Sequence, residues 1–284
     1  MTLRALAAEA EAPLRNGPHP ERARRDAETL LLHLLGQNRA WLLANWDTAA
    51  SVETQAALRG LIARRSSGEP IQYITGAAEF FGLPFAVAPG VLIPRPETEH
   101  LVEEVLRLAT QFASPAIHIA DIGTGSGAIA VALAHSLPEA HISATDISPD
   151  ALAVARANAA QNHVADRISF LEGDLLAPLK GRSFSIIASN PPYVPLRDSD
   201  SLSVEVREFE PHSALFAGQD GLNIYRRLIP EARGLLLAGG WLVMEIGFGQ
   251  QEQIQKLMNE NHYASVHFVP DYQGIPRVSV GRKL

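Results

Sequence analysis

The chain has 284 residues, of which 46% are hydrophobic, and its mean hydropathy is close to zero. These values exclude a globally disordered chain and predict a globular protein with one large domain or two. The net charge of -7 argues against a protein that holds nucleic acid mainly through its phosphates. The absence of cysteine excludes disulfides, thiolate metal sites and thiol nucleophiles.

The first segment, MTLRALAAEAEAPLR, has acidic residues where a secretory signal needs an apolar stretch. No segment approaches the roughly 20 apolar residues of a membrane span. We therefore expect a cytoplasmic protein with no membrane association.

Residues 1–72 are predicted to form a small helical domain. Apolar residues recur at helical spacing in two stretches, Ala27, Leu30, Leu31, Leu34 and Leu58, Leu61, Ile62. The region has nine Arg and eight acidic residues, hence a net charge of +1, against -8 for the remainder. A solvated helical face explains any single Arg, but the asymmetry makes this region the better candidate for docking an acidic or RNA-associated partner.

Residues 73–94 are predicted to form a β-hairpin connector. The breaker cluster SSGEP precedes two β-like stretches at 71–75 and 80–87, the second interrupted by Gly82 to Pro84.

From residue 95 to residue 284 strands alternate with helices, which predicts an α/β domain with a mainly parallel, doubly wound sheet. The last two strands have no clear helix between them and suggest a terminal hairpin. Strands are expected at 116–121, 141–146, 167–172, 184–189, 241–246, 263–269 and 276–282, and helices at 96–112, 126–136, 149–161 and 221–237.

The segment IHIADIGTGSGAIAVALAHSL joins an expected strand to a helix through three glycines. Gly123, Gly125 and Gly127 permit a sharp turn and close approach of a ligand, and the amides of the next helix favour a negatively charged group. The spacing differs from the dinucleotide fingerprint, so a turn without a ligand is an alternative.

The next strand ends in Asp146, where an acid can accept hydrogen bonds from both hydroxyls of a ribose. Ser148 and Asp150 suffice to begin the following helix, which leaves Asp146 free. Together with the glycine loop it indicates a nucleoside-containing ligand. Asp174, after the third strand, is placed to meet an adenine edge, or is an ordinary loop acid.

The stretch SIIASNPPYVPL places Asn190, Pro191, Pro192 and Tyr193 directly after another strand. A single proline would suffice to end that strand, so the pairing of two prolines after an asparagine favours a ligand site over a simple strand end.

These motifs resemble those of the Rossmann-like, class I S-adenosylmethionine-dependent methyltransferases. Two further stretches, LIPRPETE at 92–99 and EPHSALFAGQDGL at 210–222, narrow the resemblance to the HemK/PrmC family, the N5-glutamine methyltransferases of peptide chain release factors. The resemblance covers essentially the whole chain. It implies a seven-stranded sheet, S-adenosyl-L-methionine as cofactor, and methylation of the glutamine in the GGQ motif of release factors.

The resemblance also implies roles for individual residues. The glycine loop would wrap the methionine part of the cofactor, Asp146 would bind its ribose, and Leu175 would pack against its adenine. Asn190 to Tyr193 would hold the substrate glutamine, and Arg95 and Thr98 would belong to a lid, although Pro96 with Glu97 and Glu99 is also a plain helix start. The full expected cofactor set is Asp121, Gly123, Thr124, Gly125, Ser126, Gly127, Asp146, Ile147, Asp174, Leu175 and Asn190.

The chemistry of a glutamine amide fits the NPPY stretch. Its nitrogen is a poor nucleophile, because the lone pair is delocalised, so it has to be held where it can pyramidalise toward the methyl group. The Asn190 side-chain oxygen and the Pro191 carbonyl can accept its two N–H groups, neither proline offers a competing N–H, and Tyr193 supplies a flat face. Orientation alone can lower the barrier by roughly 7 to 11 kcal/mol, so no catalytic carboxylate is assigned.

Two alternative substrates remain, and neither a metal site nor an oligomer is expected. A glutamine of ribosomal protein uL3 would suit the same pocket. The same two acceptor oxygens could hold the N6 amino group of adenine, but the net charge disfavours adenine N6 methylation. No direct sequence-specific nucleic-acid binding is therefore expected. No histidine has metal-ligand spacing, and we expect a monomer.

Overall fold

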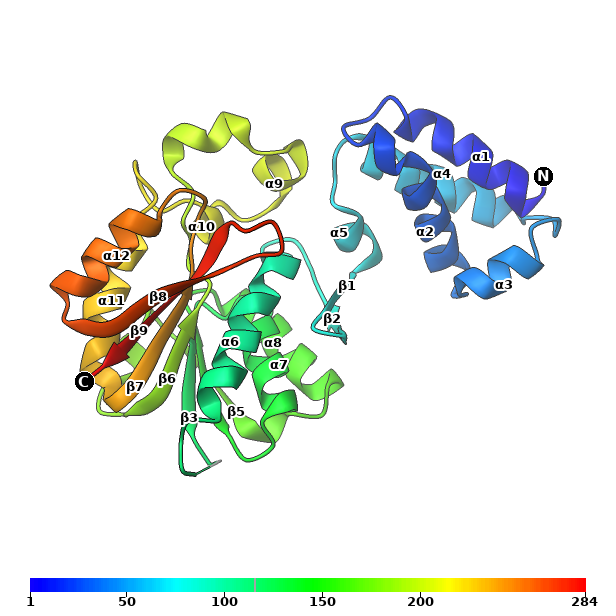
Figure 1. Ribbon diagram of the computed structural model, residues 1–284. Coiled ribbons are helices and arrows are strands. Elements are labelled where there is room, and N and C mark those ends of the chain that lie inside the picture. Colours follow the sequence, from blue (N-terminus) through cyan, green and yellow to red (C-terminus); the bar gives the residue numbers. More distant parts are fainter. Residues whose placement is uncertain (115) are drawn as a thin grey trace. The chain divides into compact units, whose positions relative to one another are not determined.

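The computed structural model describes residues 1–114 and 116–284, which form two compact units (Figure 1). The first unit contains Met1–Ala77 together with Leu202–Phe209, and the second contains Ala78–Ser201 together with Glu210–Leu284. The sequence did not predict that 202–209 joins the first unit.

The first unit is helical, as the apolar spacing predicted. Thr2, Asn38 and Ser51 each accept a hydrogen bond from a backbone N–H in the first turn of a helix, which fixes where α1, α3 and α4 begin. Leu30, Leu31 and the other inward residues of α1, α2 and α4 form its core. The elements are α1 (Leu3–Leu14), η1 (Pro20–Arg22), α2 (Ala23–Leu35), α3 (Arg39–Ala44), α4 (Val52–Ser66), α5 (Ile71–Thr75) and α9 (Val204–Phe209).

A buried ion cluster connects α9 to the other helices of this unit. The Arg65 guanidinium, 3% exposed, lies 2.6 Å from the Asp26 carboxylate on α2 and also pairs with Glu205 on α9. Because removal of one partner would leave a buried charge uncompensated, these three residues depend on one another.

One strand expectation was wrong. Residues 71–75 form the helix α5, which begins after Pro70 and ends at Gly76 in the left-handed region, whereas a strand was expected. The hairpin itself is present, as β1 (Ala77–Phe80) and β2 (Leu83–Ala86). Its two-residue turn, Phe81 and Gly82, has positive φ at both positions, the geometry that matches the twist of hairpin strands.

The second unit contains the predicted seven-stranded sheet, in the order β5-β4-β3-β6-β7-β9-β8. Neighbouring strands from β5 to β7 are parallel, and β9 is antiparallel to both β7 and β8, which confirms the terminal hairpin. The strands are β3 (His118–Ile122), β4 (His141–Asp146), β5 (Ile168–Glu172), β6 (Phe184–Ser189), β7 (Leu236–Glu245), β8 (Tyr263–Pro270) and β9 (Pro276–Lys283).

Helices cover both faces of this sheet, as expected for a doubly wound fold (Figure 1). On one face pack α6 (Glu99–Ala109), α7 (Ala128–Ser136) and α8 (Pro149–Gln161), and on the other α11 (Asn223–Leu235) and α12 (Gln251–Glu260). Shorter elements are η2 (Pro96–Thr98), η3 (Ala165–Arg167), η4 (Ala177–Leu179), η5 (Leu196–Ser201) and α10 (His212–Leu215). In the part of the chain that the structure describes, no helix has the length and apolar character to span a bilayer.

Helices α9, α10 and α12 were missed in the sequence. For α12 a signal existed, because Ile254, Leu257 and Met258 are spaced to lie on one helical face, and Ile254 and Met258 are fully buried. The helices α9 and α10 have only six and four residues, too few for a periodic pattern.

Asn158 on α8 cross-links the hairpin to the glycine loop. Its Nδ2 donates to the carbonyls of Ala86 (3.0 Å) and Ser126 (2.8 Å), and its Oδ1 accepts from the Ala86 N–H (2.7 Å). The side chain is fully buried, so water cannot replace these bonds.

We expect Asn158→Ala to lower the free energy of unfolding by about 3 kcal/mol, because one buried and two partly buried backbone groups lose their partner. Urea denaturation measures this change. The matched control is Gln161→Ala on the same helix, an exposed residue, which should cost less than about 0.5 kcal/mol. Equal stability losses in the two variants would contradict the assigned role of Asn158.

Candidate active site

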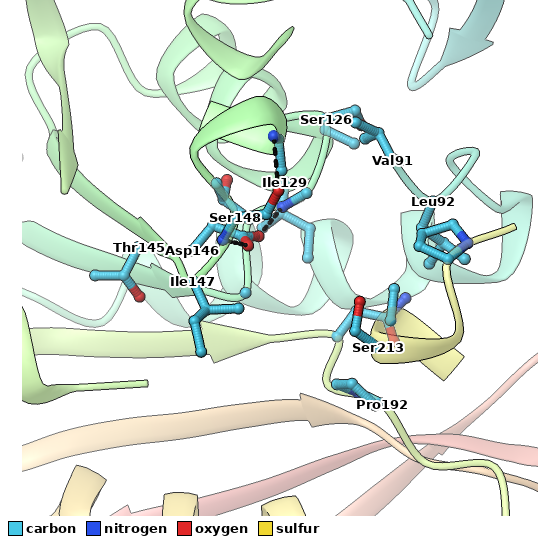
Figure 2. A pocket seen from close by; sticks show the side chains of 18 of the residues that line it. Val91, Leu92, Ser126, Ile129, Thr145, Asp146, Ile147, Ser148, Pro192 and Ser213 are labelled. Atoms are coloured by element: carbon cyan, nitrogen blue, oxygen red, sulfur yellow. Dashed lines mark hydrogen bonds between the residues drawn. The ribbon is translucent and has the colours of Figure 1, made fainter. Parts of the chain in front are cut away.

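A cavity of about 400 Å³ opens at the carboxyl ends of the parallel strands of the second unit (Figure 2). It lies where the strand order reverses, since β4 and β5 continue on one side of β3 and β6 lies on the other. This is the position at which open α/β sheets bind ligands, and the volume is in the range of small-molecule sites. Figure 2 shows Asp146, Ile147 and Ser148 along one part of the wall and Pro192 and Ser213 along another.

The glycine loop contributes to the wall, but its three glycines serve different purposes. A Cβ on Gly123 or Gly125 would meet nothing within 4 Å, so the space in front of both is open to a ligand. A Cβ on Gly127 would lie 3.0 Å from the Ala155 Cβ, so Gly127 permits the close packing of α7 on α8. Of the predicted loop residues, Gly123, Thr124, Gly125 and Ser126 line the cavity and Gly127 does not.

Asp121, at the base of the loop, is fully buried and does not line the cavity. Its Oδ2 accepts from the Thr124 hydroxyl (2.6 Å) and from the Ala130 N–H (3.2 Å), while Oδ1 has no hydrogen-bond partner among the described residues. Burial raises the pKa of the Asp121 carboxyl to about 7. An unpartnered acceptor thus remains beside the glycine loop, suited to a cationic group.

The expectation that Asp146 is free of local partners was wrong. Its Oδ2 accepts from the Gly125 N–H (2.8 Å) and its Oδ1 from the Ser148 N–H (2.9 Å), so it fixes the glycine loop as well as the turn after β4 (Figure 2). Ser148 does cap α8, as predicted, by accepting from the Ala151 N–H. Each oxygen of Asp146 keeps a second acceptor site, and the half-buried carboxylate lines the cavity.

Asp174 and Leu175 line the same cavity from the turn after β5. The Asp174 carboxylate lies 2.5 Å from Arg227 on α11, and this pair is exposed. Leu175 has a positive φ of 48°, and its carbonyl accepts from the Thr145 hydroxyl at 2.9 Å. That bond holds the Leu175 backbone in an otherwise disfavoured conformation.

The NPPY residues follow β6, and two of them, Asn190 and Pro192, line the cavity. The Asn190 Nδ2 donates to the Thr98 hydroxyl oxygen at 3.0 Å. No group of the described chain donates to its Oδ1, so that oxygen is available as an acceptor. Pro191 is buried and outside the wall.

Tyr193 lies behind the wall and is held at both ends. Its hydroxyl donates to Glu245 Oε1 (3.2 Å), and its backbone carbonyl accepts from Gln250 Nε2 (3.0 Å). A Cβ on Gly221 would lie 2.3 Å from that carbonyl oxygen, so glycine is required at 221 for the chain to pass. Burial is the main reason that the pKa of the Tyr193 hydroxyl lies above its ordinary value, so Tyr193 stays protonated.

The predicted lid residues Arg95 and Thr98 both line the cavity. Arg95 pairs with Glu210, a residue of the EPHSALF stretch, and Thr98 donates to Glu245 Oε2 at 2.5 Å.

Glu245 and a second group of wall residues were not predicted. Glu245 was detectable as the single acid at the end of the apolar strand WLVMEIG. The wall residues are apolar or small, and five of them lie within LIPRPETE and EPHSALFAGQDGL, stretches that the sequence singled out without giving these positions a role. These wall residues are Phe80, Val91, Leu92, Pro94, Pro211, Ser213, Ala214 and Ile224. Among the described residues, no group of three or more His, Asp or Glu side chains could hold a metal ion.

Comparison with known proteins identifies the family to which the chain belongs. Residues 6–76 match the PrmC N-terminal domain, and residues 101–206 match the methyltransferase small domain. The release factor glutamine methyltransferase of Geobacter sulfurreducens is 46% identical over 92% of this chain and 90% of its own length. The chain belongs to the release factor glutamine methyltransferase family. The Escherichia coli member is 41% identical over 92% of this chain and 93% of its own.

A solved structure confirms the class I methyltransferase fold of this family member. The T. thermophilus 16S rRNA N2 G1207 methyltransferase, in complex with AdoMet and guanosine, has a TM-score of 0.55 and 17% identity, over 73% of this chain and 50% of that one.

The buried carboxyl of Asp121 predicts a pH dependence of stability. Because its folded pKa lies near 7 and the ordinary value is 3.8, folding favours the protonated form, and stability is lost as pH rises between those values. We expect Asp121→Asn to remove a decline of up to about 4 kcal/mol in the free energy of unfolding across that window.

Urea denaturation of the ligand-free protein at about pH 4 and about pH 7.5 measures this decline. The exposed Asp166→Asn is the matched control and should retain the wild-type slope. If the Asp121→Asn profile ran parallel to that of the wild type, the carboxyl would not be the cause.

Proposed function

We propose that this protein transfers the methyl group of S-adenosyl-L-methionine to the side-chain N5 of the glutamine in the GGQ motif of peptide chain release factors. The observation that carries the proposal is that one cavity is lined both by the glycine loop with Asp146 and by Asn190, whose acceptor oxygen is unengaged by the described residues. Family membership over nearly the full length of the chain supports the same assignment.

The residues present fit the cofactor. The open space at Gly123 and Gly125 accommodates the methionine part. Asp121, buried beneath the loop and outside the wall, would favour its ammonium group through the charge of the ionised carboxylate and not by direct contact. Asp146 keeps acceptor capacity for the ribose hydroxyls, and Leu175 with the exposed Ile147 would pack on the adenine. The other proposed contacts are Thr124, Ser126 and Asp174, with Arg95 and Thr98 as the lid.

When bound, S-adenosylmethionine supplies an electrophilic methyl group on a positively charged sulfur. The protein's part is to present the substrate nitrogen. Asn190 Oδ1 would accept one N–H of the glutamine amide, and the Pro191 carbonyl would accept the other. Tyr193, which lies behind the wall, would support the turn that carries these acceptors and not contact the amide directly. The nitrogen is thereby oriented for attack, and orientation of this kind is worth roughly 7 to 11 kcal/mol.

The proton that leaves the methylated amide needs no strong base in this site. A protonated N-methyl amide is very acidic, so water or a backbone carbonyl can take the proton. The buried Glu245 is engaged by two hydroxyl donors and does not line the cavity, which supports leaving it out of the proton transfer.

The cavity's charges favour a protein substrate over a nucleic acid. Its two arginines, Arg95 and Arg227, are paired with Glu210 and Asp174, so the described part of the wall offers no unpaired guanidinium to a phosphate chain. Adenine N6 methylation is accordingly the weaker alternative. A glutamine of ribosomal protein uL3 would fit the same acceptors, and only the docking surface would discriminate against it.

For the whole chain we propose three parts. Residues 1–72, with 202–209 as part of the same helical unit, dock the release factor; 73–94 connect and also contribute Phe80, Val91, Leu92 and Pro94 to the cavity wall; and the remainder of 95–284 catalyses. We further propose that the enzyme acts as a monomer in the cytoplasm, where its substrate works on the ribosome.

Substitution of Asn190 should affect the rate of methyl transfer, whereas substitution of Asp146 should affect cofactor affinity. We expect Asn190→Ala to lower kcat by about 100-fold or more with little change in cofactor affinity, because a pre-positioned acceptor is lost. We expect Asp146→Ala to raise the cofactor Kd by about 10- to 100-fold, because charge-assisted hydrogen bonds are lost. Calorimetry and single-turnover kinetics separate the two effects.

The exposed Asp150→Ala, on the first turn of α8, is the control and should change neither quantity by more than about twofold. Equal loss of cofactor affinity in Asn190→Ala and Asp146→Ala would contradict the roles given to them.

The substrate is tested by offering radiolabelled S-adenosylmethionine with a release factor, uL3 and DNA in parallel. We expect label in N5-methylglutamine of the release factor, abolished when the GGQ glutamine is replaced by alanine. Label in nucleic acid alone would refute the proposal, and label in uL3 alone would move it to the other protein substrate.

A further inference from the structure

Glu245, the last residue of β7, is a carboxylate with only 2% exposure directly behind the candidate active site. Its Oε2 accepts from the Thr98 hydroxyl at 2.5 Å, and its Oε1 accepts from the Tyr193 hydroxyl at 3.2 Å. The Tyr225 hydroxyl donates to the Glu245 backbone carbonyl at 2.7 Å and anchors the strand end. Both carboxylate oxygens therefore serve residues of the site, although Glu245 does not line the cavity.

The hydrogen bond from Thr98 to Glu245 determines which atom of the Asn190 amide can face Thr98. A threonine hydroxyl has one proton, and Thr98 gives it to Glu245, so the Thr98 oxygen can only accept from its other neighbour. That neighbour is Asn190 Nδ2, at 3.0 Å. The reversed amide would bring Asn190 Oδ1 against an oxygen with no proton left to donate, a costly arrangement in a buried place.

The second oxygen of Glu245 fixes the other polar end of the motif. Tyr193 is held at its hydroxyl by Glu245 and at its backbone carbonyl by Gln250, so these bonds fix the position of the ring axis. One buried carboxylate thus acts on two of the NPPY residues, on Asn190 through Thr98 and on Tyr193 directly.

We propose that Glu245 is a positioning residue: through Thr98 it selects the Asn190 amide orientation that presents Oδ1 to the cavity, and through its second oxygen it holds the Tyr193 ring. The consequence for methyl transfer rests on the proposed function. The orientation of Asn190 does not, because it follows from hydrogen bonds within the protein.

A spectroscopic test addresses the orientation without substrate. The side-chain ¹H–¹⁵N signals of Asn190 are identified by their loss in Asn190→Ala. In Glu245→Leu the Thr98 proton becomes free to donate to Asn190 Oδ1, so we expect the Asn190 signals to shift. In the matched control Glu104→Leu, which removes a buried carboxylate of α6 that pairs with Arg107, they should stay in place.

A kinetic test addresses the consequence for methyl transfer. We expect Glu245→Leu to lower kcat by about 100-fold at saturating cofactor, with the cofactor Kd from calorimetry changed by less than about twofold. Glu245→Gln should recover most of the activity, because its amide oxygen can accept from Thr98 while its NH₂ faces the Tyr193 oxygen. The double variant Asn190→Ala/Glu245→Leu should be at most about tenfold slower than Asn190→Ala alone, because only the part of the effect that acts through Tyr193 remains.

Unmoved Asn190 signals in a folded Glu245→Leu protein, or losses that multiply in the double variant, would overturn the proposal. If Glu245→Leu does not fold, Glu245→Met decides instead, because its unbranched side chain is close to Glu in length, frees the same Thr98 proton, keeps the Thr98 oxygen in place and should shift the Asn190 signals equally. If the wild type methylated no release factor, the proposed function would fail, yet the Asn190 signals would still decide the orientation.

Discussion

The site depends on the parallel pairing of β3 with β6. This pairing places Ile122 beside Ser189, and the Ser189 hydroxyl donates to the Ile122 carbonyl at 2.7 Å. The glycine loop leaves β3 directly after this point and the NPPY stretch leaves β6, so two segments separated by more than sixty residues line one cavity. A change in the register between β3 and β6 would move the glycine loop away from the NPPY stretch, because each segment begins directly at the end of its strand.

Several polar groups at this edge of the sheet are hydrogen-bonded to one another. Asp146 accepts from Gly125 across the two loops, Thr98 joins Glu245 to Asn190, and Gln250 holds the Tyr193 carbonyl. Substitution of one member of such a network is expected to destabilise the protein, because the polar group left without a partner costs free energy where water has little access. Rigidity of the acceptors is what a reaction that relies on orientation requires.

Many strand and helix bounds of the second unit were predictable from the sequence. The bounds 141–146, 149–161 and 184–189 coincide with β4, α8 and β6, because buried strands and a Ser-Pro helix start leave strong local signals. The glycine loop, Asp146 and Asn190, which the sequence proposed as site residues, line one cavity in the structure. What was missed depends on contacts distant in sequence: the second role of Asp146, the wall between Pro211 and Ala214, and the position of Glu245 behind two other residues. Helix α5 was misread because five residues are too few to show a period.

The chain passes between its two compact units three times, after Ala77, after Ser201 and after Phe209. The helical unit is therefore not a module that can be cut off at a single point in the gene. A shortened chain that ends near residue 77 would lack α9 and leave the buried guanidinium of Arg65 without its Glu205 partner. Exchange of this unit between relatives, by recombination or by design, would have to transfer two separate pieces of sequence together.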